Sequence, residues 1–131
     1  MESAGKFPLK PKILRTIWIK TAFVGFHHWK EAPEEVAYQR ATHRHLFKVH
    51  VEVETGSSSK KLVEVHSLKV DVDKFLSTLQ SQFTLTLSPN WSLVKMSEAL
   101  SAHLMSLGYQ VMQVSFSEDN ECGSAVMFMY E

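Results

Sequence analysis

Three histidines stand where they could share one metal ion. His43-Arg44-His45 is a His-x-His within a stretch of alternating apolar and polar residues, a pattern that predicts a strand. Residues two apart on a strand point to the same face, so both imidazoles could reach one ion. His27 ends the preceding predicted strand, and antiparallel pairing would bring it beside the other two. Three imidazoles with an open fourth position are typical of a catalytic zinc site.

Other uses of these residue types remain open. Imidazole is also an ordinary exposed or hydrogen-bonded surface group, which is the alternative interpretation of each histidine. The single cysteine, Cys122, lies far along the chain in a predicted turn, so a closed structural site of Cys and His ligands is disfavoured. Cys122 itself is interpreted as a small packing residue.

The elements that must position these groups follow from hydrophobic periodicity. Period-two alternation predicts strands, and apolar spacings of three and four predict helices. The expected order is strands over 13–27 and 43–54, a short strand over 62–66 after a turn at 56–59, helices over 69–80 and 93–107, and strands over 109–117 and 124–130. The connection over 28–42 could hold one helical turn. The expected fold class is α+β, an antiparallel sheet with two helices on one face.

Two local signals mark the ends of the second predicted helix. Ser92 is a plausible N-cap, and Gly108 is the expected stop. Residues 1–12 are interpreted as an N-terminal tail, and 13–131 as a single domain.

Composition narrows the function classes. The chain has 131 residues, with 14 Lys and Arg balancing 14 Asp and Glu, and 7 His. Zero formal charge argues against a nucleic-acid or membrane-surface binder. The N-terminal stretch lacks the apolar segment of a signal peptide, and one cysteine is compatible with a reducing compartment, so a cytoplasmic location is expected.

Four segments, in this order, resemble the 6-pyruvoyl-tetrahydropterin synthase and 6-carboxytetrahydropterin synthase family. They are Phe23-Val24-Gly25-Phe26-His27, His43-Arg44-His45-Leu46-Phe47-Lys48-Val49, Val63-Glu64-Val65-His66-Ser67-Leu68-Lys69 and Val114-Ser115-Phe116-Ser117-Glu118. The resemblance implies a tunnelling fold, Zn²⁺ as cofactor with His27, His43 and His45 as ligands, and a homo-oligomer built as a trimer or hexamer.

The resemblance also assigns a binding role to Glu118. A carboxylate can accept two adjacent N–H groups from the amidine edge of a pterin or guanine, which makes Glu118 the expected anchor of such a heterocycle. Phe26 is grouped with it as a candidate ligand-binding residue. The alternative for Glu118 is a solvated turn residue, as Asp119 and Glu121 are interpreted to be.

The chain departs from the family where catalysis is concerned. The family's thiol before the His-x-His is missing, and so is its Asp-His pair after the first helix. Some family members use a glutamate instead, which makes Glu34 or Glu35 a candidate proton-transfer group, with Tyr38 as another candidate. Solvated carboxylates are the simpler interpretation of Glu34 and Glu35.

Three hypotheses therefore stand. One is a zinc-dependent lyase acting on dihydroneopterin triphosphate. The second is a non-catalytic protein that binds and sequesters a pterin or a purine-like signalling nucleotide. The third is an assembly subunit that uses its sheet edges. The sequence of residues 25–37 resembles that of divergent family members carried by bacteriophages. For such members, this resemblance makes a 7-deazaguanine pathway one setting to consider.

Overall fold

The protein is described by a computed structural model that covers residues 9–27, 31–41, 43–56, 64–85 and 92–130. Within these ranges the side chains of residues 27, 39, 43 and 81–85 are left undescribed. The elements are β1 (Thr16–His27), η2 (Glu34–Arg40), β2 (His43–Glu54), α1 (Val65–Leu85), α2 (Leu93–Ser106), β3 (Gln110–Glu118) and β4 (Cys122–Met127).

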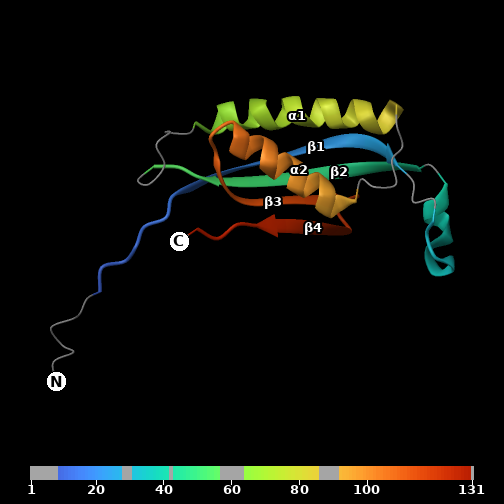
Figure 1. Cartoon of the computed structure of the whole chain (residues 1–131), viewed down its shortest axis with the longest axis horizontal. Coiled ribbons are helices and arrows are strands. Elements are labelled where there is room, and N and C mark those ends of the chain that lie inside the picture. The colour runs from blue at the N-terminus through green and yellow to red at the C-terminus, as the bar shows by residue number, and fades with distance from the viewer. Residues whose placement is uncertain (1–8, 28–30, 42, 57–63, 86–91, 131) are drawn as a thin grey trace, which may run out of the picture.

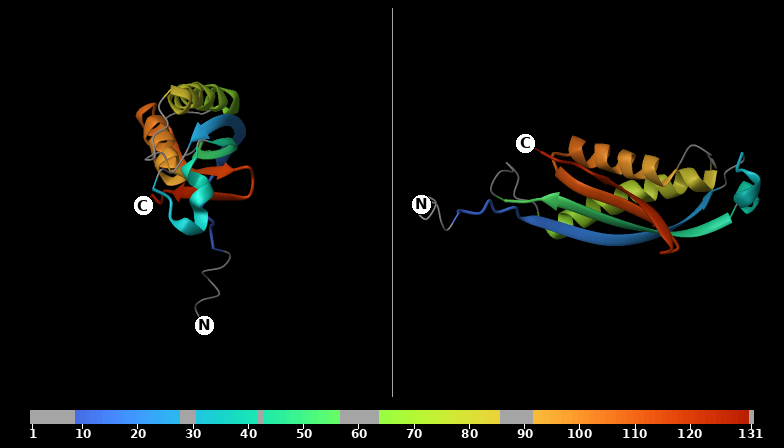
Figure 2. Two further views of the ribbon diagram at one scale, coloured as in Figure 1. Left: turned by 90° about the vertical axis from the view of Figure 1, so that its right-hand side faces the viewer. Right: turned by 90° about the horizontal axis from the view of Figure 1, so that it is seen from below.

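The four strands form one antiparallel sheet in the order β1-β2-β3-β4. Both α-helices lie on one side of it, and no helix of the described residues covers the other side (Figures 1 and 2). The α+β class and the layer arrangement predicted from periodicity are therefore confirmed. None of the described helices is both long enough and apolar enough to cross a bilayer.

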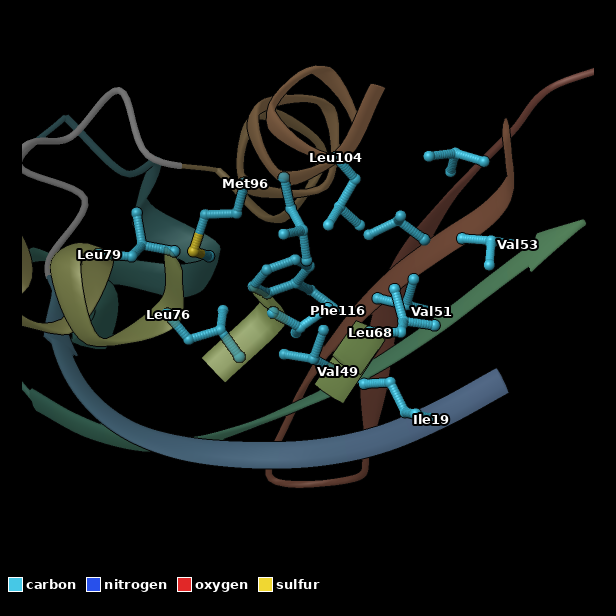
Figure 3. Packing of buried hydrophobic residues seen from close by; sticks show 14 of the residues in the cluster. Ile19, Val49, Val51, Val53, Leu68, Leu76, Leu79, Met96, Leu104 and Phe116 are labelled. Atoms are coloured by element: carbon cyan, nitrogen blue, oxygen red, sulfur yellow. The ribbon is translucent and has the colours of Figure 1, made fainter. Parts of the chain in front are cut away.

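Alternation along β1 and β2 determines which face of the sheet is buried. Ile19 and Phe23 of β1 are buried, as are Phe47 and Val49 of β2, whereas Trp18 is 56% exposed. Because antiparallel partners share a face, the odd-numbered residues of both strands form the floor of the core. Apolar residues of the helices pack onto this floor; in Figure 3 these include Leu68, Leu76, Leu79, Met96 and Leu104, together with Phe116 of β3.

The second helix begins and ends as the sequence predicts. The Ser92 hydroxyl accepts the backbone N–H of Lys95 at 3.1 Å, which is an N-cap contact. Gly108 follows the helix with a φ of 97°, a left-handed conformation that glycine adopts readily. The expected extent of 93–107 is one residue longer than α2.

The first helix differs from expectation at its start. Val65 and His66 belong to α1, so a strand over 62–66 is wrong there, while residues 62 and 63 lie outside the described residues. Glu64 explains the difference, because its carboxylate accepts the Ser67 amide at 3.0 Å and closes the first helical turn. Val65 also packs against the core, continuing the helical stripe toward Leu68.

Three further boundaries are corrected by the structure. The helix α1 runs to Leu85, past the expected end at residue 80. The strand β1 begins at Thr16 rather than at residue 13, because its partner β2 ends opposite Thr16 at Glu54. The last strand spans Cys122–Met127 instead of 124–130.

Candidate functional site

The candidate site lies at the end of the sheet where β2 begins and β3 turns into β4. His45 of β2 is the best-defined residue of this site, with a side chain that is 11% exposed. Its Nδ1 lies 2.7 Å from Oδ2 of Asp119, a residue 74 positions away in the sequence. His45 therefore has its ring orientation set by a carboxylate from the β3–β4 turn.

The turn places Asp119 by folding it back onto β2. Asp119 and Asn120 have φ values of 52° and 61°, in the left-handed region that Asp and Asn tolerate better than most residues. The Asp119 amide donates to the carbonyl of Leu46 at 2.7 Å, and its Oδ1 accepts the Leu46 amide at 2.9 Å. Asp119 thus attaches the turn to β2 by three contacts to two successive residues, His45 and Leu46.

This arrangement determines the tautomer of His45. The hydrogen bond with His45, followed by the one from the Leu46 amide, lowers the pKa of the Asp119 carboxyl below its usual value. An ionised carboxylate can only accept, so Nδ1 of His45 carries the proton that is shared with it. In the neutral ring the lone pair then lies on Nε2. A carboxylate holding the far nitrogen is the usual companion of a metal-ligating histidine.

Glu118 lies beside the nitrogen that this tautomer leaves as an acceptor. Its Oε2 is 3.9 Å from Nε2 of His45, which is a buried atom, and the Glu118 side chain is only 17% exposed. The register pairs Glu118 with Phe47 on the core face of the sheet. Glu118 is therefore not the solvated turn residue that the alternative interpretation supposed.

The backbone register brings the three predicted metal ligands together. His27 is the direct partner of His43, and His45 is two residues further along β2, so all three positions belong to one face of the sheet. The position opposite His45 is Gly25, which adds no side chain next to the imidazole.

The metal site itself stays a prediction. Among the side chains that the structure describes, no three or more His, Cys, Asp or Glu residues gather closely enough to hold an ion. The side chains of His27 and His43 are not among those described. What the structure contributes is the common face of the three positions and the orientation of His45.

The candidate proton-transfer residues are exposed. Glu34, Glu35 and Tyr38 all lie on the 3-10 helix η2, where Glu34 forms an ion pair with Arg40 at 3.2 Å and its side chain is 86% exposed. Tyr38 is 71% exposed. The burial that turns a glutamate into a base near neutrality is absent at Glu34 in this chain.

Phe26 and Cys122 take different positions relative to the site. Phe26 pairs with Arg44 and is 38% exposed, on the sheet face opposite the one that carries His45 and Glu118. The structure therefore does not bring Phe26 beside Glu118. Cys122 is exposed at the start of β4, where it is the direct partner of Glu118.

Asp119 is the residue of the candidate site that sequence reasoning missed, since it was interpreted as a solvated turn residue. Its contacts to His45 and Leu46 connect the turn between β3 and β4 with β2, a strand far away in the sequence. The available signal was weak: an Asp-Asn pair directly after a strand predicts a turn, but it does not indicate what the carboxylate accepts.

The comparisons with known proteins establish the fold and nothing finer. No family model matches the chain, and no curated protein matches it in sequence. Among solved structures, an uncharacterized protein from Wolinella succinogenes is similar, with a TM-score of 0.53 and 15% sequence identity. The match covers 88% of this chain and 99% of that one, so the similarity extends over nearly the whole α+β arrangement.

Proposed function

We propose that this chain is a tunnelling-fold protein that binds zinc through His27, His43 and His45 and holds a pterin or purine-like heterocycle through Glu118. The observation that carries the proposal is the contact between His45 and Asp119, at 2.7 Å. It leaves the Nε2 lone pair of His45 on the buried side, next to Glu118. The donor set fits zinc, which prefers neutral imidazole ligands with a hydrogen-bonded second nitrogen.

Glu118 is suited to recognise the heterocycle. Its side chain is largely buried, where a charge-assisted hydrogen bond is worth more than in water. Pterin and guanine present two adjacent N–H donors to one carboxylate, whereas adenine does not. When bound, zinc would polarise a ligand oxygen or acidify a water molecule beside this anchor.

Binding without conversion is the function that the described residues support best. The glutamates considered for proton transfer are exposed on η2. A lyase acting on dihydroneopterin triphosphate is the second candidate, and the position of Cys122 opposite Glu118 favours it, because a thiol there would lie on the same face as the anchor.

Assembly into a homo-oligomer is part of the proposal. Among the residues that the structure describes, the edge strands β1 and β4 each have a partner strand on one side only. Such edges are templates for pairing with another copy, and a closed ring would cover both of them.

The first test measures zinc. Protein stripped with a chelator and reloaded with Zn²⁺ is analysed by elemental mass spectrometry and native mass spectrometry. We expect about one zinc per chain in the wild type. The control variant His66→Ala, which removes an exposed histidine at the start of α1, should bind the same amount. His43→Ala and His45→Ala should lose the ion. Equal zinc in all four proteins would refute the ligand assignment.

The second test measures the heterocycle. GTP and dihydroneopterin triphosphate are titrated into the zinc-loaded protein, with ATP as the comparison. Glu118→Gln should keep zinc but bind GTP roughly 10- to 100-fold more weakly, the range expected for losing a charged hydrogen-bond partner. Product formation from dihydroneopterin triphosphate that disappears in Cys122→Ser would favour the lyase. Binding with no product would favour the sequestering protein.

A further inference from the structure

The uncovered face of the sheet carries a second, unrelated feature. A groove of about 440 Å³ lies there, a volume within the range of small-molecule sites. It is bordered by Lys20, Lys48, His50, Ser115, Ser117 and Asn120, and Ala22 also contributes to it. The even-numbered residues of β1 and β2 in this group lie on the face opposite the helices.

The register turns these residues into a compact grid. One row across the sheet is Lys20, His50 and Ser115, and the next row is Ala22, Lys48 and Ser117. Neighbouring strands are about 4.8 Å apart, and diagonal positions on adjacent strands are roughly 7–8 Å apart. The two ammonium groups and the imidazole can therefore converge on one group a few ångströms across.

The sizes of the side chains explain the hollow. Ala22, Ser115 and Ser117 are small and form a floor, while Lys20 and Lys48 are long, exposed side chains that rise beside it. The serine hydroxyls can donate hydrogen bonds into the groove. Small residues between two cations leave a space that solvent, or an anion, must fill.

Charge distinguishes this groove from the rest of a chain whose formal net charge is zero. None of the described residues that line it is acidic. Glu52, two residues from His50 on the same face of β2, is not among the described lining residues, and its carboxylate accepts the Thr16 hydroxyl at 2.6 Å. The groove thus combines local positive charge with hydroxyl donors and no described counter-ion in its lining.

We propose that this groove binds the condensed phosphate group of a small molecule, with Lys20, Lys48 and His50 as the anion-binding residues. A di- or triphosphate matches two cations, several donors and the span of the grid. The site lies on the opposite face of the sheet from His45 and Glu118, so it does not depend on the zinc site or on the heterocycle anchor.

Trp18 provides a reporter next to the groove. The Lys20 ammonium lies 5.6 Å from the centre of the Trp18 ring, and the His50 ring centre lies 5.9 Å from it. Drawing Lys20 toward an anion would change this cation–π contact, and the fluorescence of Trp18 with it. Trp18→Phe identifies the part of the signal that comes from this residue.

The experiment titrates sodium tripolyphosphate into the full-length, metal-free protein, followed by calorimetry and tryptophan fluorescence. We expect saturable binding that weakens strongly when NaCl is raised, because exposed charges are screened by salt. Lys20→Gln and Lys48→Gln should each weaken binding about tenfold, the effect of one charged partner. Lys74→Gln, an exposed lysine on α1, is the matched control and should bind like the wild type.

Two comparisons identify the source of the phosphate. Equal affinity for tripolyphosphate and GTP would show that the phosphates alone are recognised. If GTP binds more tightly than tripolyphosphate and Trp18→Ala removes the difference, the base also stacks on the Trp18 ring. Wild-type affinity in the Lys20→Gln/Lys48→Gln double variant, or an equal loss in Lys74→Gln, would overturn the proposal. So would preferential binding of single-stranded oligonucleotides over both small ligands.

The same titration separates this proposal from the zinc proposal. His45→Ala should lose zinc and keep tripolyphosphate binding, because His45 and the groove lie on opposite faces of the sheet.

Discussion

Replacing Asp119 by Asn tests how His45 is oriented. The carboxylate uses its two oxygens for two donors: Oδ1 accepts the Leu46 amide at 2.9 Å, and Oδ2 lies 2.7 Å from Nδ1 of His45. An asparagine of the same shape has one oxygen and one NH₂ group. The Leu46 amide can only donate, so the oxygen of Asn would turn to it and the NH₂ group would face His45.

The consequence is a change of tautomer. An NH₂ group facing Nδ1 requires that nitrogen to accept, which moves the ring proton to Nε2 and removes the lone pair that would bind zinc. Loss of such an orienting partner typically weakens metal binding by about 10- to 100-fold. We expect Asp119→Asn to weaken zinc binding by that factor without removing any ligand.

Two measurements check this prediction. Long-range proton–nitrogen NMR spectra of the metal-free protein report which ring nitrogen of His45 is protonated, and competition with a chromophoric chelator gives the zinc affinity. Glu121→Gln is the matched control, since it removes an exposed carboxylate from the same turn. An unchanged Nδ1–H tautomer together with an unchanged zinc affinity in Asp119→Asn would refute the reasoning.

Three other predictions concern stability. Phe116→Ala should lower the free energy of unfolding by about 3–5 kcal/mol in urea titrations, because the ring is fully buried, whereas Met127→Ala, 69% exposed, should change it by less than about 0.5 kcal/mol. Ser92→Ala removes the N-cap of α2 and should cost about 1 kcal/mol in the same assay. Burial, followed by the 2.5 Å hydrogen bond to Asp71, raises the pKa of the Tyr109 hydroxyl, so the stability it contributes is present below about pH 10 and is lost as the pH rises through the raised pKa. The midpoint temperature of thermal unfolding should therefore fall less steeply between pH 8 and 12 in Tyr109→Phe than in the wild type. Parallel curves of this temperature against pH for the two proteins would contradict the prediction.

Local patterns were sufficient for most of the fold. Alternation along β2 predicts the observed bounds, His43–Glu54, because a half-buried strand shows its two faces directly in the sequence. The N-cap at Ser92 and the stop at Gly108 follow from backbone chemistry that involves only a few neighbouring residues. The error at Val65 arose because a short apolar run fits both the strand period of two and the helix period of about 3.6. The contact of the Glu64 carboxylate with the Ser67 amide stabilises the helical alternative.

The candidate site divides in the same way. That His27, His43 and His45 could share a face was predictable, since it depends only on period two and antiparallel pairing. The roles of Asp119 and Glu118 were not predictable from spacing. Both depend on where the β3–β4 turn lies relative to β2, which is a contact between segments more than 70 residues apart.

The sequence by itself determined the α+β class, the buried face of β1 and of β2, and the set of histidines able to meet. Only the tertiary structure decided which nitrogen of His45 is available, because that depends on the Asp119 carboxylate reaching across from another hairpin. It also decided that Lys20, Lys48 and Ser117, on three different strands, border one groove. The physical reason is that periodicity is local, whereas the register between strands is settled by the packing of the whole sheet.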